Sequence, residues 1–190
     1  MQKPNRPNSR SGFSLMEIIV AVSILSILAA ALATRAGGMI EKGKSGKIIN
    51  LVSTLKTACT AYNVDTGNFA REYSGYPVAH RKLSGTQTEP GWSGPYLEGP
   101  ITHAQNPYGG QMHLYDLVTA GNWISGFDVD ADGTLDVTGN ASMLYMNGIE
   151  ESEAKSINDA IDLGLTGSWQ DRGRVVYQAG SKRLLILVFY

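Results

Sequence analysis

Cysteine is almost absent from this chain of 190 residues: Cys59 stands alone, so no disulfide can form within one molecule. The common catalytic signatures are also missing, including the G-x-S-x-G nucleophile elbow, the phosphate-binding loop and a Cys–His arrangement. Three histidines occur without the spacing of a metal site, and we expect them on the surface or in loops: His80, His103 and His113. We therefore do not expect an enzyme.

One long apolar run dominates the N-terminal part of the chain. Residues 13–34 contain a single charged residue, Glu17. As a helix rising about 1.5 Å per residue, the run would reach about 33 Å, enough to cross a bilayer core of about 30 Å. A carboxylate at the centre of such a helix costs about 2.5–3.5 kcal/mol. We interpret Glu17 as functional and expect it to have a cationic partner.

A basic leader, residues 1–12, precedes the apolar run and contains no acid. Positive charge ahead of an apolar run keeps that end on the cytoplasmic side of the membrane. The junction reads GFSLME from Gly12 to Glu17. This junction resembles the N-terminus of type IV pilins and of the type II secretion pseudopilins.

In that family a prepilin peptidase cleaves after the glycine, the new N-terminal Phe is methylated, and the fifth mature residue is Glu. Gly12, Phe13 and Glu17 match these positions. The resemblance implies that Glu17 pairs with the Phe13 amine of a neighbouring subunit in a filament. The implied partners are the prepilin peptidase, other copies of this chain, minor pseudopilins or pilins, an inner-membrane assembly platform and membrane lipid.

An ordinary secretory signal is the alternative for the same segment, because it also combines a basic stretch with an apolar run. Ala31-Leu32-Ala33 would supply its cleavage site. An ordinary signal has a shorter apolar core and no carboxylate, and a plain signal anchor leaves Glu17 unexplained. We favour the pilin-like interpretation.

Residues 35–66 are expected to continue the same helix as its amphipathic half. Glycines crowd the first part, and each costs a helix interior about 1 kcal/mol relative to alanine, so we expect the helix to be weakest at Gly37, Gly38, Gly43 and Gly46. A buried stripe at 3- and 4-residue steps follows: Ile48, Leu51, Val52, Leu55, Ala58, Cys59 and Tyr62. Gly67 is a plausible end of the helix.

Residues 67–190 are expected to form a periplasmic αβ globular domain. Its first part, residues 70–111, is rich in turn residues. Two of its pieces resemble the major pseudopilin: GPYL (94–97), and in part NPYG (106–109), where that family usually has Asp-Pro-Trp-Gly. Generic turns that contain aromatic residues are the alternative. The patterns then predict a strand at 112–119 that pairs with 123–127, a helix at 150–163, and a hairpin of 174–178 with a buried strand at 184–190. The fold class is α+β: a long N-terminal membrane-spanning helix packed on a small C-terminal antiparallel β-sheet.

An acidic loop lies inside this domain and reads DVDADGTLD. Alternate aspartates followed by Gly133 have the spacing of a calcium loop, with candidate ligands Asp128, Asp130, Asp132 and Asp136. Position 12 of such a loop is Gly139 instead of Glu, so this is not a complete EF-hand. The resemblance to the major pseudopilins also implies calcium, while an acidic solvated turn is the alternative.

These patterns together predict a structural subunit of a type II secretion pseudopilus, anchored once in the inner membrane with its domain in the periplasm and later part of a filament. Many type IV pilins carry a C-terminal disulfide loop, which a single cysteine cannot supply. Loss of the leader leaves 13 − 17 = −4 charges, so no nucleic-acid partner is expected. The alternatives are a type IV pilus subunit for adhesion, motility or DNA uptake, and a secreted calcium-binding protein.

Overall fold

The structure, a computed structural model, describes residues 12–118 and 123–190, with the backbone alone at residues 33–37. The chain divides into two compact units, Met1–Ile40 and Glu41–Tyr190. Two parts of the predictions lie outside the described residues: the leader before Gly12, and the end of the expected strand at Thr119.

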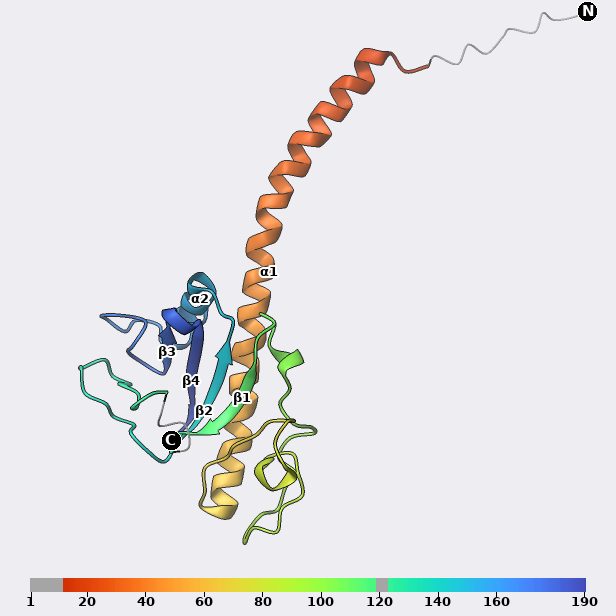
Figure 1. The fold of residues 1–190 in the computed structure, drawn as a ribbon. Helices are drawn as coiled ribbons and strands as arrows, with labels where there is room; N and C mark the ends of the chain where they lie inside the picture. Colours follow the sequence, from red (N-terminus) through yellow and green to blue (C-terminus); the bar gives the residue numbers. More distant parts are fainter. Residues whose placement is uncertain (1–11, 119–122) are drawn as a thin grey trace, which may run out of the picture. The chain divides into compact units, whose positions relative to one another are not determined.

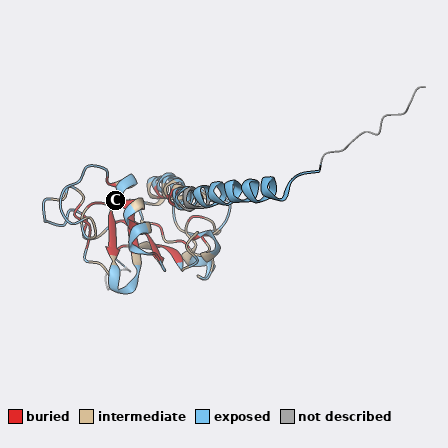
Figure 2. Cartoon of the chain, turned by 90° about the horizontal axis from the view of Figure 1, so that it is seen from above, coloured by how far each residue is buried: buried red, intermediate tan, exposed pale blue. Residues whose placement is uncertain are grey.

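The first unit contains the start of a long helix, α1, which spans Leu15–Thr66 (Figure 1). The segment Leu15–Leu32 is long and apolar enough to cross a membrane, and all of it is exposed in the single chain (Figure 2). Large apolar side chains cover every side of this segment, as expected where lipid or other subunits replace water. This arrangement agrees with the expected membrane helix.

The glycine-rich part of α1 is helical in the single chain. Apart from its chain neighbours and the nearby backbone of its own helix, a Cβ atom built on Gly38, Gly43 or Gly46 would meet no described atom within 4 Å. No contact within the described chain therefore requires glycine at these three positions. The expected weakness of the helix here rests on intrinsic propensity and stays a prediction.

The second unit contains a four-stranded antiparallel sheet in the order β1-β2-β4-β3 (Figure 1). A second helix, α2, comes between β2 and β3 in the chain. The element bounds are β1 Met112–Asp116, β2 Ser142–Asn147, α2 Glu151–Ile161, β3 Val175–Gln178 and β4 Arg183–Phe189, with short 3₁₀ turns η1 Val78–His80, η2 His103–Gln105 and η3 Ala179–Ser181. The expected α+β class, the second helix and the β3–β4 hairpin are confirmed.

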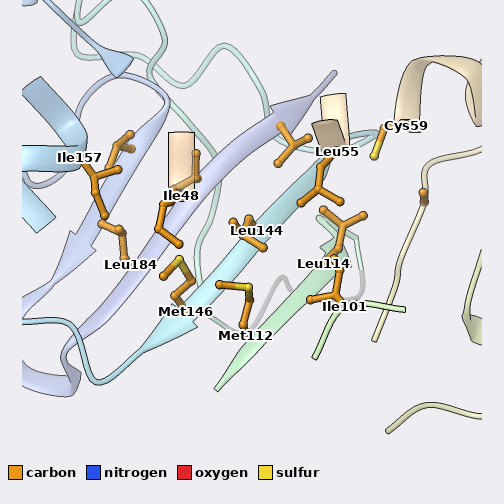
Figure 3. Close-up of a cluster of buried hydrophobic side chains, with 14 of the residues drawn as sticks. Ile48, Leu55, Cys59, Ile101, Met112, Leu114, Leu144, Met146, Ile157 and Leu184 are labelled. Atoms are coloured by element: carbon orange, nitrogen blue, oxygen red, sulfur yellow. The ribbon is translucent and has the colours of Figure 1, made fainter. Parts of the chain in front are cut away.

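One face of the sheet packs against the second half of α1 (Figure 3). The predicted stripe supplies this contact: Ile48, Leu55 and Tyr62 are fully buried, and Leu51 and Val52 are half-buried. Cys59 is buried in the same core, which raises the pKa of its thiol to about 12. The helix ends at Thr66, followed by Gly67 with a φ of 72°.

The opposite face of the sheet carries a second apolar cluster, formed by Leu117, Phe127, Val137, Ala141, Met143, Tyr145, Val176, Leu185 and Leu187. Because both faces are covered, every residue of β4 from Leu184 to Val188 is buried. This confirms the expectation for the last strand.

One expectation about strands is wrong, and one strand was not expected. The segment 123–127 does not pair with β1; Phe127 instead forms an isolated bridge with Val137. The partner of β1 is β2, which the sequence patterns did not reveal, with Leu114 opposite Leu144. The sequence of β2, SMLYMN, is buried on both faces and therefore lacks the alternation by which a half-buried strand is recognised.

The expectation for the histidines is wrong for His113. It lies on β1 with 8% of its surface exposed, enclosed by tyrosine rings. Aromatic neighbours from distant parts of the chain exclude water from it, and a local sequence pattern does not predict such neighbours. His80 in η1 and His103 in η2 lie in loops as expected.

Both outer edges of the sheet already carry hydrogen bonds. On the β1 edge, Leu114 and Glu72 exchange two backbone hydrogen bonds of 2.9 and 3.0 Å. On the β3 edge, the Val175 N–H donates to the Asp162 carboxylate at 2.8 Å, and the Tyr177 N–H donates to the Gln170 carbonyl at 2.7 Å. The middle of each edge strand is thus occupied by the chain's own groups.

The carboxylate of Glu72 is fully buried beside the β1 edge. It accepts hydrogen bonds from the Leu83 N–H at 2.7 Å, the Ser84 N–H at 3.1 Å and the Ser84 hydroxyl at 2.7 Å. Burial raises the pKa of Glu72, while these three donors act in the opposite direction. Glu72 therefore holds the loop at residues 83–84 to the sheet.

Candidate functional site

The segment around Gly12 and Phe13 is exposed and non-helical, and α1 begins two residues later at Leu15. The Phe13 side chain is 84% exposed, and a Cβ atom on Gly12 would meet no described atom within 4 Å. The predicted scissile bond therefore lies in exposed, non-helical backbone just ahead of the helix. A peptidase can reach such a bond without unwinding a helical turn.

Ser14 and Glu17 cap the start of α1 reciprocally. The Ser14 N–H donates to the Glu17 carboxylate at 2.8 Å, and the Glu17 N–H donates to the Ser14 hydroxyl at 3.2 Å. This is the capping-box arrangement, which satisfies two backbone donors that a helix start leaves without partners. It places the only acid of the apolar run at the positive end of the helix.

Glu17 thus has a local role in the single chain that the sequence interpretation did not assign to it. The Ser-x-x-Glu spacing was the signal that could have revealed this role. A second subunit would add a cation to a carboxylate already held in a fixed place. The pairing of Glu17 with a neighbouring Phe13 amine stays a prediction.

The acidic loop brings together three of its four predicted ligands. Asp128, Asp130 and Asp136 each offer one carboxylate oxygen, and these atoms lie within 4.8 Å of one another. Asp128 is buried, while Asp130 and Asp136 are exposed. Clustered carboxylate oxygens are the ligands that calcium prefers, so this group can hold such an ion.

Asp132 is engaged differently. Its Oδ1 atom accepts hydrogen bonds from the Thr134 hydroxyl at 2.5 Å and from the Thr134 N–H at 2.7 Å. These two bonds lower the pKa of Asp132, with a smaller effect from Arg172. Asp132 therefore stabilises the turn and lies outside the group of three.

The loop is closed at its base and tied to the segment before β3. The Phe127–Val137 bridge closes it, and the Asp128 carboxylate accepts from the Gly133 N–H at 3.0 Å. Gly133, with a φ of 98°, supplies the left-handed conformation that the reversal requires. From the other side, Arg172 and the Gly173 N–H donate to backbone carbonyls of the loop at 2.9 and 2.7 Å.

Comparison with known proteins supports the N-terminal part of this site. A family described as the prokaryotic N-terminal methylation motif matches residues 7–33, a range that includes Gly12, Phe13 and Glu17. Neither curated proteins nor solved structures give a match to the chain. The chain therefore carries the N-terminal methylation motif of type IV pilin-like proteins, a class that includes both pilus and pseudopilus subunits, and the motif implies processing by a prepilin peptidase.

Proposed function

We propose that this protein is a structural subunit of a type II secretion pseudopilus, assembled from the inner membrane to drive protein export. The observation that carries the proposal is the start of α1. A methylation motif with an exposed Gly12–Phe13 bond stands directly ahead of a capped, membrane-length apolar helix whose single acid is Glu17. The α+β domain after the helix has the layout of pilin-like proteins.

In the proposed cycle the apolar half of α1 holds the processed subunit in the inner membrane, with the domain in the periplasm. On assembly, the same exposed apolar surface would move from lipid to the filament core. Glu17 would then accept the Phe13 amine of a neighbouring subunit. A charge buried in an apolar core is tolerated when it is paired and hydrogen-bonded, and the Ser14 N–H already supplies one such bond.

A type IV pilus subunit is the close alternative, because the methylation motif is common to both machines. Two features favour the pseudopilus. Cys59 is the only cysteine and is buried, so the disulfide loop of many pilins is absent. The pieces GPYL (94–97) and NPYG (106–109) also resemble the major pseudopilin.

Processing is tested by expressing the full chain with and without a prepilin peptidase and measuring the intact mass and N-terminal sequence. We expect a membrane-held product that starts at methylated Phe13. A soluble product that starts at Thr34 would show instead that an ordinary signal peptidase acts, and would refute the proposal.

Assembly is tested with Glu17→Gln, using Glu41→Gln as the matched control because Glu41 lies exposed on the same helix. We expect Glu17→Gln to be processed normally but to leave filaments unformed, while Glu41→Gln assembles. Loss of the gene should trap an exported protein in the periplasm. Loss of surface pili with export intact would assign the chain to a pilus.

We further propose that the acidic loop binds one calcium ion through Asp128, Asp130 and Asp136. The proximity of their oxygens supports this, as does the tight turn at Gly133. The loop also contacts Arg172 and Gly173, just before β3. An ion held there would stabilise the contacts between the loop and the segment before β3.

A further inference from the structure

Two histidines far from the acidic loop face each other through their ring nitrogens. The Nε2 atoms of His103, in η2, and His113, on β1, lie 3.3 Å apart. Their ring centres are 5.1 Å apart, and the rings are inclined by 64°. Neither the methylation motif nor the proposed filament role uses this pair.

The two distances match those of two imidazoles bound to one ion. Two nitrogens each about 2.05 Å from a tetrahedral zinc ion lie about 3.3 Å apart, and their ring centres lie about 5.2 Å apart. A straight N–H···N hydrogen bond of the same length would place the ring centres about 5.6 Å apart. The observed distances therefore fit a shared metal ion better than a straight hydrogen bond.

The Tyr73 ring packs against both imidazoles. Burial, with a further contribution from His103, lowers the pKa of His113 to about 4. The His103 ring stacks on Tyr73, and its Nδ1 atom lies 3.5 Å from the Tyr73 hydroxyl.

The buried ring of His113 also has a nitrogen that lacks a partner. Its Nδ1 atom makes no hydrogen bond with any residue of the described ranges. Nε2 is therefore the ring nitrogen through which the buried side chain of His113 meets a polar partner, the Nε2 atom of His103.

We propose that His103 and His113 bind a late first-row divalent ion, of which Zn²⁺ is the simplest probe, through their Nε2 atoms. Among the residues that the structure describes, no third His, Cys, Asp or Glu joins this pair in a ligand group. Water would complete the coordination. Imidazole ligands select zinc, copper or nickel, while carboxylates select calcium, which separates this site from the acidic loop. A bound ion would fasten η2 to the edge strand β1.

The test uses the full chain in detergent micelles with excess calcium, titrated with Zn²⁺ by calorimetry at pH 7.5. We expect one zinc ion per chain, and a loss of affinity of about tenfold or more in both His103→Ala and His113→Phe. Phenylalanine suits the aromatic surroundings of His113. His80→Ala is the matched control, since His80 lies outside the pair, and it should bind zinc as the unchanged chain does.

Three results would overturn the proposal: no zinc binding by the unchanged chain, equal affinity in all the histidine variants, or loss of zinc binding in Asp130→Asn. The last result would place the ion in the acidic loop. If His113→Phe does not fold, as judged by its circular dichroism, His103→Ala decides the question alone, because His103 lies in a short loop turn.

Discussion

Calcium should stabilise the domain through Asp130 and not through Asp132, although both are exposed aspartates two residues apart. The Asp130 carboxylate belongs to the group of three, whereas Asp132 is turned to Thr134. Asp130→Asn and Asp132→Asn remove the same charge and keep the same shape. The pair therefore separates a specific calcium site from a general effect of negative charge.

The expected magnitude follows from mass action. An ion that binds only the folded state stabilises it by about 2.7 kcal/mol at a hundredfold excess over its dissociation constant. For a domain of this size, each kcal/mol raises the melting temperature by about 2–4 °C, so calcium should raise it by about 5–10 °C. Without the ion, repulsion among Asp128, Asp130 and Asp136 should leave the loop loose.

The assay is thermal unfolding of Glu41–Tyr190, a compact unit of its own, in millimolar calcium and in chelator. Asp130→Asn should lose most of the difference between the two conditions, and Asp132→Asn should keep most of it. If the melting temperature of the unchanged domain is the same in calcium and in chelator, the loop is an acidic turn that binds no calcium. Equal losses in both variants would contradict the separation of Asp132 from the group of three.

Two further predictions concern folding and assembly. Glu72→Ala leaves the donors of Leu83 and Ser84 without their acceptor, so the free energy of unfolding, measured with urea, should fall by about 2–5 kcal/mol. The exposed control Glu98→Ala should change it by less than about 0.5 kcal/mol, and equal unfolding midpoints of the two variants would contradict the anchoring role of Glu72. The second variant has alanine at all four helix glycines: Gly37, Gly38, Gly43 and Gly46. It should stabilise the isolated helix by about 4 kcal/mol in total and impair filament formation, as measured by helix content and electron microscopy. An unbroken helix through these positions in a filament map would contradict the prediction.

The sequence was most informative where burial is one-sided or where chemistry has a fixed spacing. The stripe from Ile48 to Tyr62 repeats with the helical period because only one side of α1 meets the sheet. The methylation motif around Gly12 and Phe13 needs no tertiary structure, since it is one continuous segment of the chain. The β3–β4 hairpin is likewise local, with its turn between neighbouring strands.

The parts that escaped prediction depend on contacts between distant residues. The strand β2 lies in the middle of the sheet, and its methionines and leucine pack on both faces, so its pattern fits a helix equally well. His113 is buried by Tyr73 and Tyr145, which lie 40 and 32 positions away in the chain. The division between Asp132 and the other aspartates depends on the side-chain bond to Thr134, which spacing alone does not specify.

The occupied edges of the sheet have a consequence for how copies of this chain meet. An unpaired edge strand is a template on which a second chain adds its own strand, the usual start of uncontrolled aggregation. Here Glu72 forms hydrogen bonds with one edge strand, and Asp162 and Gln170 accept hydrogen bonds from the other. Under the proposed function, subunits in the membrane would therefore not join through their sheets, and the exposed apolar half of α1 would be the surface through which they associate.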